Sequence, residues 1–375
     1  MTKQIITILF IMPLLILSTI TTAAIQPFYP NTNITTTEIP SSFDWRNVNG
    51  INYVTPVKNQ APAPLCESYG LCVALETIVQ YKVGYPFSCD LSEAHLFFYA
   101  GGSIARGGVR LTNASDYLIE HGVPDEGCFP DPHRPTDSPF QSLAGWENRT
   151  VKITSWGWVE NNITAIKQAL ITYGPLVLVI HNYNDFLRYR KGIYTPKVTT
   201  GHGHVVALVG YNDTQRYWII KNSAGEDWGE DGYARVSYDA DTADHPFIAT
   251  FYGGTGIMYL DGVYGNFKSD VPKIQITKPN IFHTYFFGFE ISTLFKKGVI
   301  IQKGAPRLIG QNTVEVNASN TDNVEFYVDG KLVYTDIQPP YTWNINLTKG
   351  LRTIETVGHH NNTISKDIRD VYQLT

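Results

Sequence analysis

The first part of the chain is rich in apolar residues, which follow one another at mixed spacings at Leu71, Val73, Leu75, Ile78 and Val79. From about Pro64 to Gly102 the patterns are helical, and one helix is expected from near Pro64 to about Val83. The turn residues Gly84-Tyr85-Pro86 would end that helix. Ser92 is placed to cap a second helix, and a third is predicted from Thr112 to His121.

The pattern changes towards strands from about Val151 onward. One further helix is expected near Ile163 to Tyr173, and continuous or alternating apolar runs follow it. These predicted strands are Leu176–Ile180, Val205–Val209 and Tyr217–Ile220. Because helices come first and strands follow, the order indicates an α+β fold and argues against a doubly wound sheet.

A separate group of strand candidates lies at the C-terminal end. Residues 266–272 are predicted to link a domain over residues 39–265 to a second one over 273–375. Asp329-Gly330 predicts a two-residue hairpin, because both positions accept the positive φ of a type I′ turn. About seven strands in about a hundred residues indicate an all-β sandwich. The candidates are Lys273–Thr277, Gly298–Gln302, Thr313–Val316, Val324–Val328, Lys331–Tyr334, Tyr341–Ile345 and Leu351–Thr356.

The first 24 residues have the pattern of a secretory signal peptide. A short basic start precedes a mostly apolar run from Ile5 to about Ile20, and small residues lead to a cleavage site near Ala24. An uncleaved anchor helix is the alternative, and only that alternative would place the protein in a membrane. Residues 25–38, rich in Pro, Asn and Thr, are predicted to be an unstructured leader.

Composition changes this picture only slightly. A hydrophobic content of 43% and a charged content of 17% fit a folded globular protein, and the net charge of -5 gives no reason to expect a nucleic acid partner. Together with the signal peptide, Asn-x-Ser/Thr triplets favour a secreted or extracellular cell-surface glycoprotein, although an Asn- and Thr-rich chain also produces them by chance. The triplets begin at Asn33, Asn113, Asn148, Asn162, Asn212, Asn317, Asn346 and Asn361.

The chain has four cysteines. Cys66 would lie in the first turn of a helix, where unpaired N–H groups and the helix dipole lower the pKa of a thiol. Cys72 lies on another face of the same helix and is expected in the core. Cys89 and Cys128 lie in turn-rich surroundings, and we hypothesise a disulfide between them. The spacings match no zinc motif, so we expect no metal and no cofactor.

A cysteine nucleophile also needs a base, a group that orients the base, and donors for the oxyanion. His204 stands at the mouth of a predicted buried strand and Asn222 at the end of the next. Cys66 and His204 are 138 positions apart, inside the roughly 130–150 spacing of one class of cysteine nucleophile. Taken singly, His204 and Asn222 would more often be strand-end residues with satisfied hydrogen bonds.

Several motifs, in one order, resemble the papain family of cysteine peptidases. The resemblance covers about residues 39 to 262 and implies a two-lobed fold, with a helical lobe that carries Cys66, a β-barrel-like lobe that carries His204, and a substrate cleft between them. The motifs are Phe43-Asp44-Trp45-Arg46, Thr55-Pro56-Val57-Lys58-Asn59-Gln60, Leu91-Ser92-Glu93, Gly174-Pro175-Leu176-Val177, His204 with Gly210-Tyr211, Lys221-Asn222-Ser223 and Trp228-Gly229-Glu230-Asp231-Gly232-Tyr233.

The resemblance also implies a role for single residues. Cys66 would be the nucleophile and His204 the base and imidazolium partner. Asn222 would orient His204, and Gln60 would donate to the oxyanion together with the Cys66 backbone N–H. Gly107-Gly108 resembles the glycine pair whose backbone binds an extended peptide in this family, and a surface turn is the alternative.

Four positions depart from the family pattern. Glu67 and Ala224 stand where the family usually has tryptophans, Ala63 replaces a bridging cysteine, and Pro64 replaces a glycine. A carboxylate beside the thiol would raise the pKa of that thiol, against the helix dipole. Ala224 would leave the hydrogen bond between the histidine and the asparagine less shielded from water. The short leader leaves no room for the family's large inhibitory propeptide, so activity is expected to need another control or none.

The sequence therefore predicts a secreted or cell-surface cysteine peptidase with a peptide or protein substrate. The alternative is a papain-fold surface protein for binding or adhesion whose site has decayed. The C-terminal region resembles the Ig-like modules of bacterial and archaeal surface proteins, on the strength of Val324–Gly330 and Pro339–Trp343. It has no cluster that we would predict to be catalytic. A role as a spacer, or in binding a cell-surface glycan, the wall or a partner, is expected for it.

Overall fold

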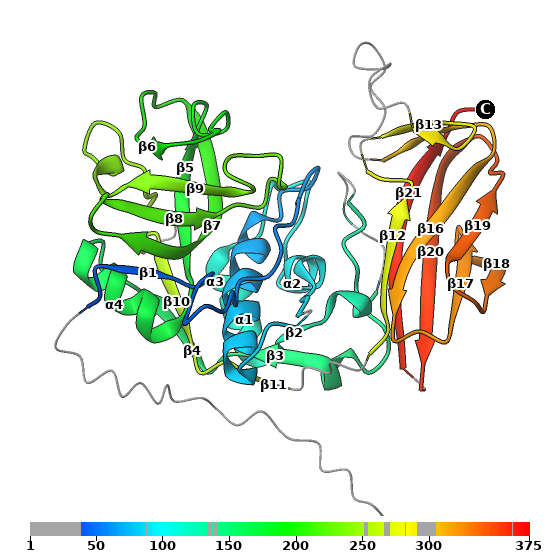
Figure 1. The fold of residues 1–375 in the computed structure, drawn as a ribbon, viewed down its shortest axis with the longest axis horizontal. Helices are drawn as coiled ribbons and strands as arrows, with labels where there is room; N and C mark the ends of the chain where they lie inside the picture. Colours follow the sequence, from blue (N-terminus) through cyan, green and yellow to red (C-terminus); the bar gives the residue numbers. More distant parts are fainter. Residues whose placement is uncertain are drawn as a thin grey trace, which may run out of the picture.

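The structure is a computed structural model in which an α+β domain is followed by a β-sandwich (Figure 1). The predicted signal peptide, the leader and the strand candidate over residues 298–302 lie outside the described residues, as does most of the predicted linker. The described residues are 39–87, 89–133, 137, 141–250, 254–265, 271–281, 283–290, 305–361 and 363–375.

A long buried helix, α1 (Cys66–Val83), runs through the middle of the first domain (Figure 1). Gly84 ends it with a φ of +85°, and its N–H donates to the carbonyls of Gln80 and Tyr81. Residues 66–80 are all buried, so the helix is enclosed by the rest of the domain. Among the described residues, no helix has the length and the apolar character that crossing a bilayer requires.

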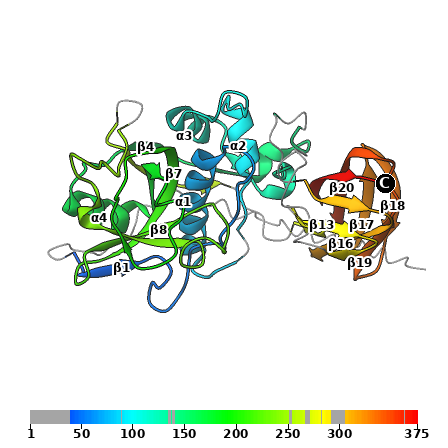
Figure 2. The ribbon, with the colours of Figure 1, turned by 90° about the horizontal axis from the view of Figure 1, so that it is seen from above.

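Shorter elements surround α1 on the helical side of the domain (Figure 2). The Ser92 hydroxyl caps the helix after it by accepting from the His95 N–H at 3.0 Å, as predicted. The third predicted helix is also present, shifted by one residue. The elements are α2 (Glu93–Tyr99), α3 (Leu111–Glu120), the 3-10 turns η1 (Glu126–Cys128) and η2 (Trp146–Arg149), and a small sheet of β2 (Val123–Pro124), β3 (Thr150–Lys152) and β11 (Tyr264–Gly265).

A curved sheet forms the other side of the domain. Its strand order is β4-β10-β5-β7-β8-β9-β6, and β1 (Ser42–Asp44) pairs with β7. The predicted helix α4 (Ile163–Tyr173) and the three predicted strands are confirmed. The strands are β4 (Ser155–Trp158), β10 (Ile257–Asp261), β5 (Leu176–Tyr183), β7 (Gly201–Asn212), β8 (Tyr217–Lys221), β9 (Tyr233–Ser237) and β6 (Ile193–Tyr194), and the turn η3 (Tyr238–Ala240) follows β9.

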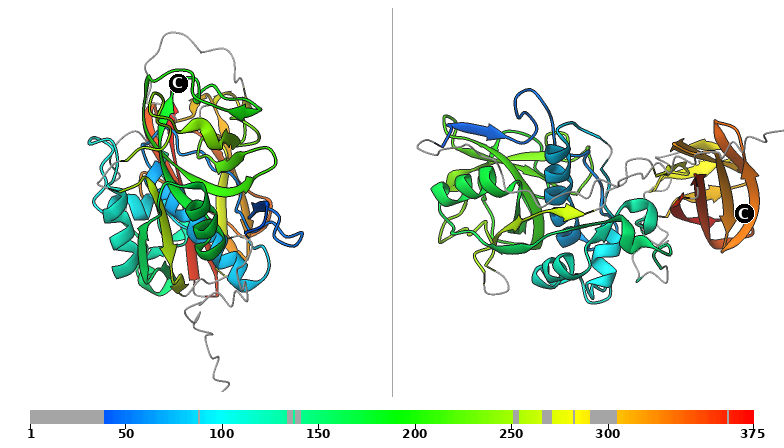
Figure 3. Two further views of the ribbon diagram at one scale, coloured as in Figure 1. Left: turned by 90° about the vertical axis from the view of Figure 1, so that its left-hand side faces the viewer. Right: turned by 90° about the horizontal axis from the view of Figure 1, so that it is seen from below.

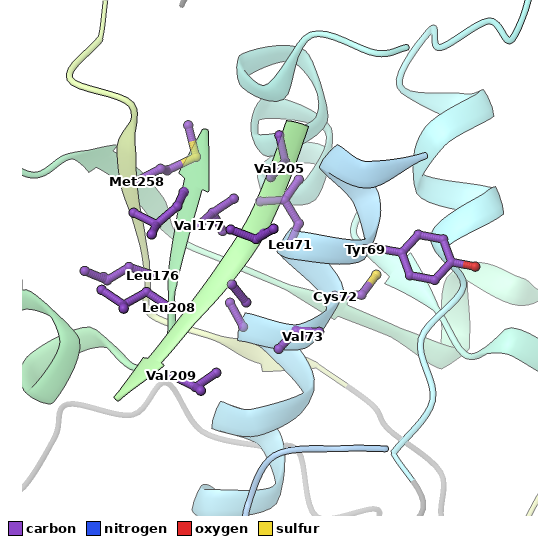
Figure 4. Close-up of a cluster of buried hydrophobic side chains, with 14 of the residues drawn as sticks. Tyr69, Leu71, Cys72, Val73, Leu176, Val177, Val205, Leu208, Val209 and Met258 are labelled. Carbon is purple, nitrogen blue, oxygen red and sulfur yellow. The ribbon is translucent and has the colours of Figure 1, made fainter. Parts of the chain in front are cut away.

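The helix and the sheet meet in one hydrophobic core (Figure 4). Gly70 lies where α1 crosses β7 and β5: a Cβ atom there would be 2.9 Å from Val205 Cγ1 and 3.3 Å from Val177 Cγ1. A larger residue would therefore push the helix away from the sheet. Leu71 and Cys72 are fully buried on α1, so the predicted core position of Cys72 is confirmed.

The C-terminal domain is a sandwich of two sheets, as predicted. Residues of both sheets, among them Val314 and Phe326, bury a common core. Asp329 and Gly330 have φ of 48° and 77° between β17 and β18, which confirms the predicted hairpin. One sheet has the order β12 (Lys273–Lys278), β16 (Asn312–Ser319), β19 (Tyr341–Ile345). The other has the order β14 (Phe289–Glu290), β13 (Thr284–Phe286), β15 (Arg307–Ile309), β21 (Thr363–Gln373), β20 (Gly350–His360), β17 (Asn323–Val328), β18 (Lys331–Asp336).

The two domains lie side by side (Figure 3), and the side chain of Arg149 joins them. Its guanidinium donates to both carboxylate oxygens of Asp125, at 2.7 and 2.5 Å. It also donates across the interface to the Ile364 carbonyl at 2.8 Å and to Ser365 Oγ at 3.2 Å, both on β21. Gly127 leaves room for Ser365, because a Cβ at position 127 would lie 2.5 Å from Ser365 Oγ. A bidentate, largely buried arginine therefore joins the sandwich to the helical side of the first domain.

All four cysteines are free, so the predicted disulfide between Cys89 and Cys128 is wrong. The Cys128 thiol lies 3.7 Å from Asp125 Oδ2, within the arginine contact just described. Cys89 is buried close to the charges of Asp90, Glu76 and Lys58. The turn-rich sequence around both residues reflects packing against two different polar clusters, and it does not bring the two sulfur atoms together.

Replacing Arg149 by alanine should loosen the contact between the domains. Asp125 would stay buried without its partner, a loss that costs about 3–5 kcal/mol in buried ion pairs. We expect a lower melting temperature and, in small-angle X-ray scattering, a larger radius of gyration. Arg216→Ala is the matched control, since the Arg216–Asp239 pair is exposed and exposed pairs contribute little to stability. Equal radii of gyration for the two variants would contradict this role of Arg149.

Candidate active site

Cys66 is the first residue of α1, and its side chain is 9% exposed. No side chain caps this helix end, so the N–H groups of the first turn have no side-chain acceptor there. Backbone N–H groups of Glu67 and of Val205, on β7, are within hydrogen-bonding range of the sulfur. A thiolate at this position would have donors from both sides of the domain.

His204 lies next to Val205 on β7 and is held by Asn222. The distance from His204 Nε2 to Asn222 Oδ1 is 2.9 Å, and the same oxygen accepts from the Ser223 N–H at 2.8 Å. An oxygen acceptor requires Nε2 to carry the proton, which leaves Nδ1 as the lone-pair nitrogen. Ala224 is exposed, yet Asn222 is only 6% exposed, so other atoms bury most of this bond.

Gln60 reaches the site from the loop that precedes α1. Its Nε2 donates to the Ala63 carbonyl at 3.0 Å, and its Oε1 accepts from Ser223 Oγ at 2.6 Å. The Gln60 backbone N–H also donates to the Ser223 carbonyl at 3.0 Å. The Ala63 carbonyl can only accept, so it fixes which end of the amide is nitrogen, and the second N–H of Nε2 remains as a donor.

Glu67 contacts the Cys66 thiol directly. Cys66 Sγ donates to Glu67 Oε2 at 3.5 Å, and Glu67 is itself only 9% exposed. The carboxylate also accepts from the Val109 N–H, and a Cβ on Gly108 would lie 3.1 Å from Glu67 Oε1. Within the part of the chain that the structure describes, no hydrogen bond joins Cys66 to His204. The thiol proton is therefore directed at Glu67.

Gly107 and Gly108 lie in a turn before α3, and Gly108 is close to this carboxylate. Gly108 has its N–H and its carbonyl paired with Ser103, at 3.2 and 3.3 Å. The Gly107 N–H donates to Ile104 at 3.0 Å. A peptide that paired with Gly108 would have to replace the bonds to Ser103, whereas the Gly107 carbonyl has no such bond within the described residues.

Burial sets the charges of the site. It raises the pKa of the Cys66 thiol well above its usual value, and the charge of Glu67 raises it further. Burial likewise raises the pKa of Glu67 to about 7 and lowers the pKa of His204 to about 4. The expectation that the helix start lowers the thiol pKa is wrong here, because desolvation and the adjacent carboxylate outweigh the helix dipole.

The contacts that three residues make in the site were not predicted from the sequence. Ser223 orients Gln60 and binds Asn222. The only sign of this role in the sequence was the place of Ser223 in the Lys221-Asn222-Ser223 motif. The backbone N–H groups of Val205 and Val109 act through main-chain geometry. Side-chain identity at those two positions carries no information about a backbone donor.

The described residues contain no group of three or more His, Cys, Asp or Glu side chains placed to hold a metal ion. The adjacent histidines of the second domain bind single carboxylates: His359 lies 3.0 Å from Glu325, and His360 lies 3.1 Å from Asp322. These contacts join neighbouring parts of the sandwich.

A cysteine at a helix start, opposite a strand that carries an asparagine-bound histidine, defines a thiol-hydrolase type of site on an α+β domain. The family model described as "Papain family cysteine protease" matches residues 39–249, and the "Bacterial Ig domain" model matches residues 307–361. The first match covers more than half of the 375 residues. The chain therefore belongs to the papain family of cysteine proteases, with an Ig-like domain after it.

Individual relatives agree with this assignment. Fruit bromelain of Ananas comosus is 27% identical over 56% of this chain and 59% of its own length. Cathepsin 7 of Rattus norvegicus is 30% identical over 54% of this chain and 62% of its own length. Cysteine proteinase 2 of Entamoeba histolytica is 31% identical over 60% of this chain and 71% of its own length. This chain thus spans about six tenths of the first two relatives. A solved structure of Ananas comosus bromelain with the E64 inhibitor has 26% identity, covers 59% of this chain and 99% of its own, and has a TM-score of 0.49.

The half-buried His204 ring should be neutral at all pH values from 5 to 8. NMR of protein labelled at histidine carbons can follow its titration, and we expect a pKa near 4 because burial disfavours the imidazolium. Cys66→Ser should leave this pKa unchanged, because a neutral thiol adds little charge at the ring. A pKa above 7 that falls in Cys66→Ser would contradict the prediction, since it would reveal a thiolate partner.

Proposed function

We propose that this protein is an exported cysteine peptidase in which Cys66 is the nucleophile. The observation that carries the proposal is the bond from His204 Nε2 to Asn222 Oδ1, which leaves Nδ1 unprotonated, one residue from the Val205 N–H that faces the sulfur. A base with its lone pair free, beside a thiol at a helix start, is what acyl transfer to sulfur requires. Family membership supports the same reaction.

The proposed reaction has two halves. The Cys66 sulfur attacks the peptide carbonyl carbon and forms a C–S bond while the thiol proton passes to His204 Nδ1. The carbonyl oxygen becomes an oxyanion, for which Gln60 Nε2 and the Cys66 backbone N–H are the donors. The C–N bond then breaks, and His204 returns the proton to the leaving amine. Water next attacks the thioester, His204 takes its proton, and the carboxylic acid leaves as the thiol re-forms.

The substrate is proposed to be an extended peptide along the Gly107–Gly108 segment. This segment adjoins Glu67, which adjoins the nucleophile, so a chain bound there would pass close to the sulfur. The free Gly107 carbonyl would accept a backbone N–H of the peptide. Replacement of the Gly108–Ser103 pair would supply a further donor and acceptor.

Secretion or display at the cell surface is part of the proposal. Its support is the signal-peptide pattern of the first 24 residues and the Ig-like domain. Binding of a surface glycan, the wall or a partner by the C-terminal domain fits the same location. A second candidate function, a binding protein with a decayed site, is favoured by one observation: the thiol proton is directed at Glu67 and not at His204.

A thiol-directed peptidyl epoxide should label Cys66 and abolish hydrolysis of a fluorogenic peptide. Cys66→Ala should lose at least about a thousandfold in kcat, because the variant lacks the sulfur on which the acyl group would form. Cys72→Ala is the control, since Cys72 is a buried thiol of the same helix that lies in the core. It should be labelled and active like the natural protein. Absence of labelling between about pH 4 and 9 in folded protein would favour the binding protein.

Replacing Gln60 by alanine should lower kcat by about a hundredfold and leave KM nearly unchanged, because loss of one oxyanion donor acts on the transition state. Steady-state kinetics on the same peptide measures both constants. Gln168→Ala serves as the control, because Gln168 bonds Thr172 on the outer helix α4. A rise in KM at constant kcat would show that Gln60 binds the ground state and is no oxyanion donor.

A further inference from the structure

The carboxyl group of Glu67 is a second proton-exchanging group at the sulfur. We propose that Glu67 gates the nucleophile: its protonated form donates to the Cys66 sulfur and leaves the thiol proton to His204, whereas its ionised form accepts the Sγ–H bond and withholds that proton. The inference rests on the proposed function and adds a catalytic residue to it.

The contacts of Glu67 fix its carboxyl group against the sulfur. One oxygen, Oε2, lies 3.5 Å from Cys66 Sγ. The Val109 N–H binds the carboxylate from the other side, and Gly108 packs against Oε1 because it lacks a Cβ. A side chain held at both ends and 9% exposed cannot turn away to solvent. The negative charge of Glu67 therefore lies next to the Cys66 thiol whenever Glu67 is ionised.

Few other charged groups face this pair. On α1 the partner of Glu67 is Cys66 itself, and the segment at Gly108–Val109 contributes only main-chain atoms. Glu67 is the charged group with the largest effect on Cys66. Across the site, on β7, His202 is the ionisable side chain that acts on His204. The protonation of Glu67 is thus the variable that changes the charge next to the sulfur.

The proton balance of the two forms is simple. With Glu67 protonated, its O–H donates to sulfur, the S–H bond breaks towards His204 Nδ1, and a thiolate and an imidazolium form without any net loss of protons. With Glu67 ionised, the same transfer would place two negative charges 3.5 Å apart in a buried site. The S–H···O bond to Glu67 is then the stable arrangement. Because burial raises the pKa of Glu67 to about 7, the change falls within the neutral range.

The direction of the pH effect follows. Peptide hydrolysis should decline by about tenfold for each pH unit above 7, as the ionised form accumulates. Most buried thiols become more reactive as pH rises, because the thiolate fraction grows. The gate therefore predicts the opposite trend for catalysis.

Glu67→Gln tests the proposal, since glutamine has the same shape, donates an N–H to sulfur and cannot ionise. Two rates should be measured from pH 5.5 to 8.5: alkylation of Cys66 by iodoacetamide, followed by peptide mass spectrometry, and peptide hydrolysis. The alkylation rate of Glu67→Gln relative to the natural protein should be near one at pH 5.5 and at least about ten at pH 8.5. The variant should also lack the decline of hydrolysis above pH 7. Glu120→Gln, at an exposed carboxylate, should match the natural protein throughout.

An alkylation ratio that does not change with pH would overturn the gate, as would an unaltered alkaline decline in Glu67→Gln. Alkylation needs no peptidase activity, so a protein that alkylates as predicted but hydrolyses nothing would reject the proposed function and keep the gate. If the variant failed to fold, the natural protein alone would decide: hydrolysis that keeps rising from pH 7 to 8.5 would overturn the gate.

Discussion

The close contact between α1 and β7 is the constraint on which the site depends. Gly70 lets the helix approach until the Val205 side chain would touch a Cβ, so the first turn of the helix comes beside the start of the strand. Cys66 and His204, far apart in the sequence, are thereby placed at neighbouring positions. The loop before the helix is tied to the end of β8 by Gln60 and Ser223, and this contact adds Asn222 to the same place. One packing contact and one loop contact thus assemble groups from three parts of the chain.

The same packing determines the charges. Enclosing Cys66 removes water from its thiol, from His204 and from Glu67, and each group is driven towards its neutral form. The backbone donors at the sulfur act in the opposite sense, since they favour a thiolate. A resting site of neutral groups, from which charge develops only during attack, follows from this balance. The second domain lies outside this arrangement, and Arg149 holds it to the helical side.

Much of the fold could be predicted because its signals are local. The apolar runs gave α4 and β5, and the Asp329-Gly330 pair gave its hairpin. The order of the motifs indicated the papain family, and the comparisons confirm it. Strand β21 was missed because its charged residues hide the strand pattern, and their burial depends on contacts with β12 and with the first domain. The sign of the thiol pKa shift and the absence of the disulfide depend on three-dimensional packing, which cannot be inferred from the spacing of residues in the sequence.

The central claim is that the Cys66 sulfur becomes acylated during turnover. A direct test mixes the protein with an ester of a blocked peptide that is deacylated slowly. The reaction is quenched in acid, and the mass of the intact protein is measured by mass spectrometry. The account predicts a transient mass increase equal to the acyl group, located on the peptide that contains Cys66 and absent in Cys66→Ala. Ester cleavage without any adduct on Cys66, or an adduct on another residue, would contradict it.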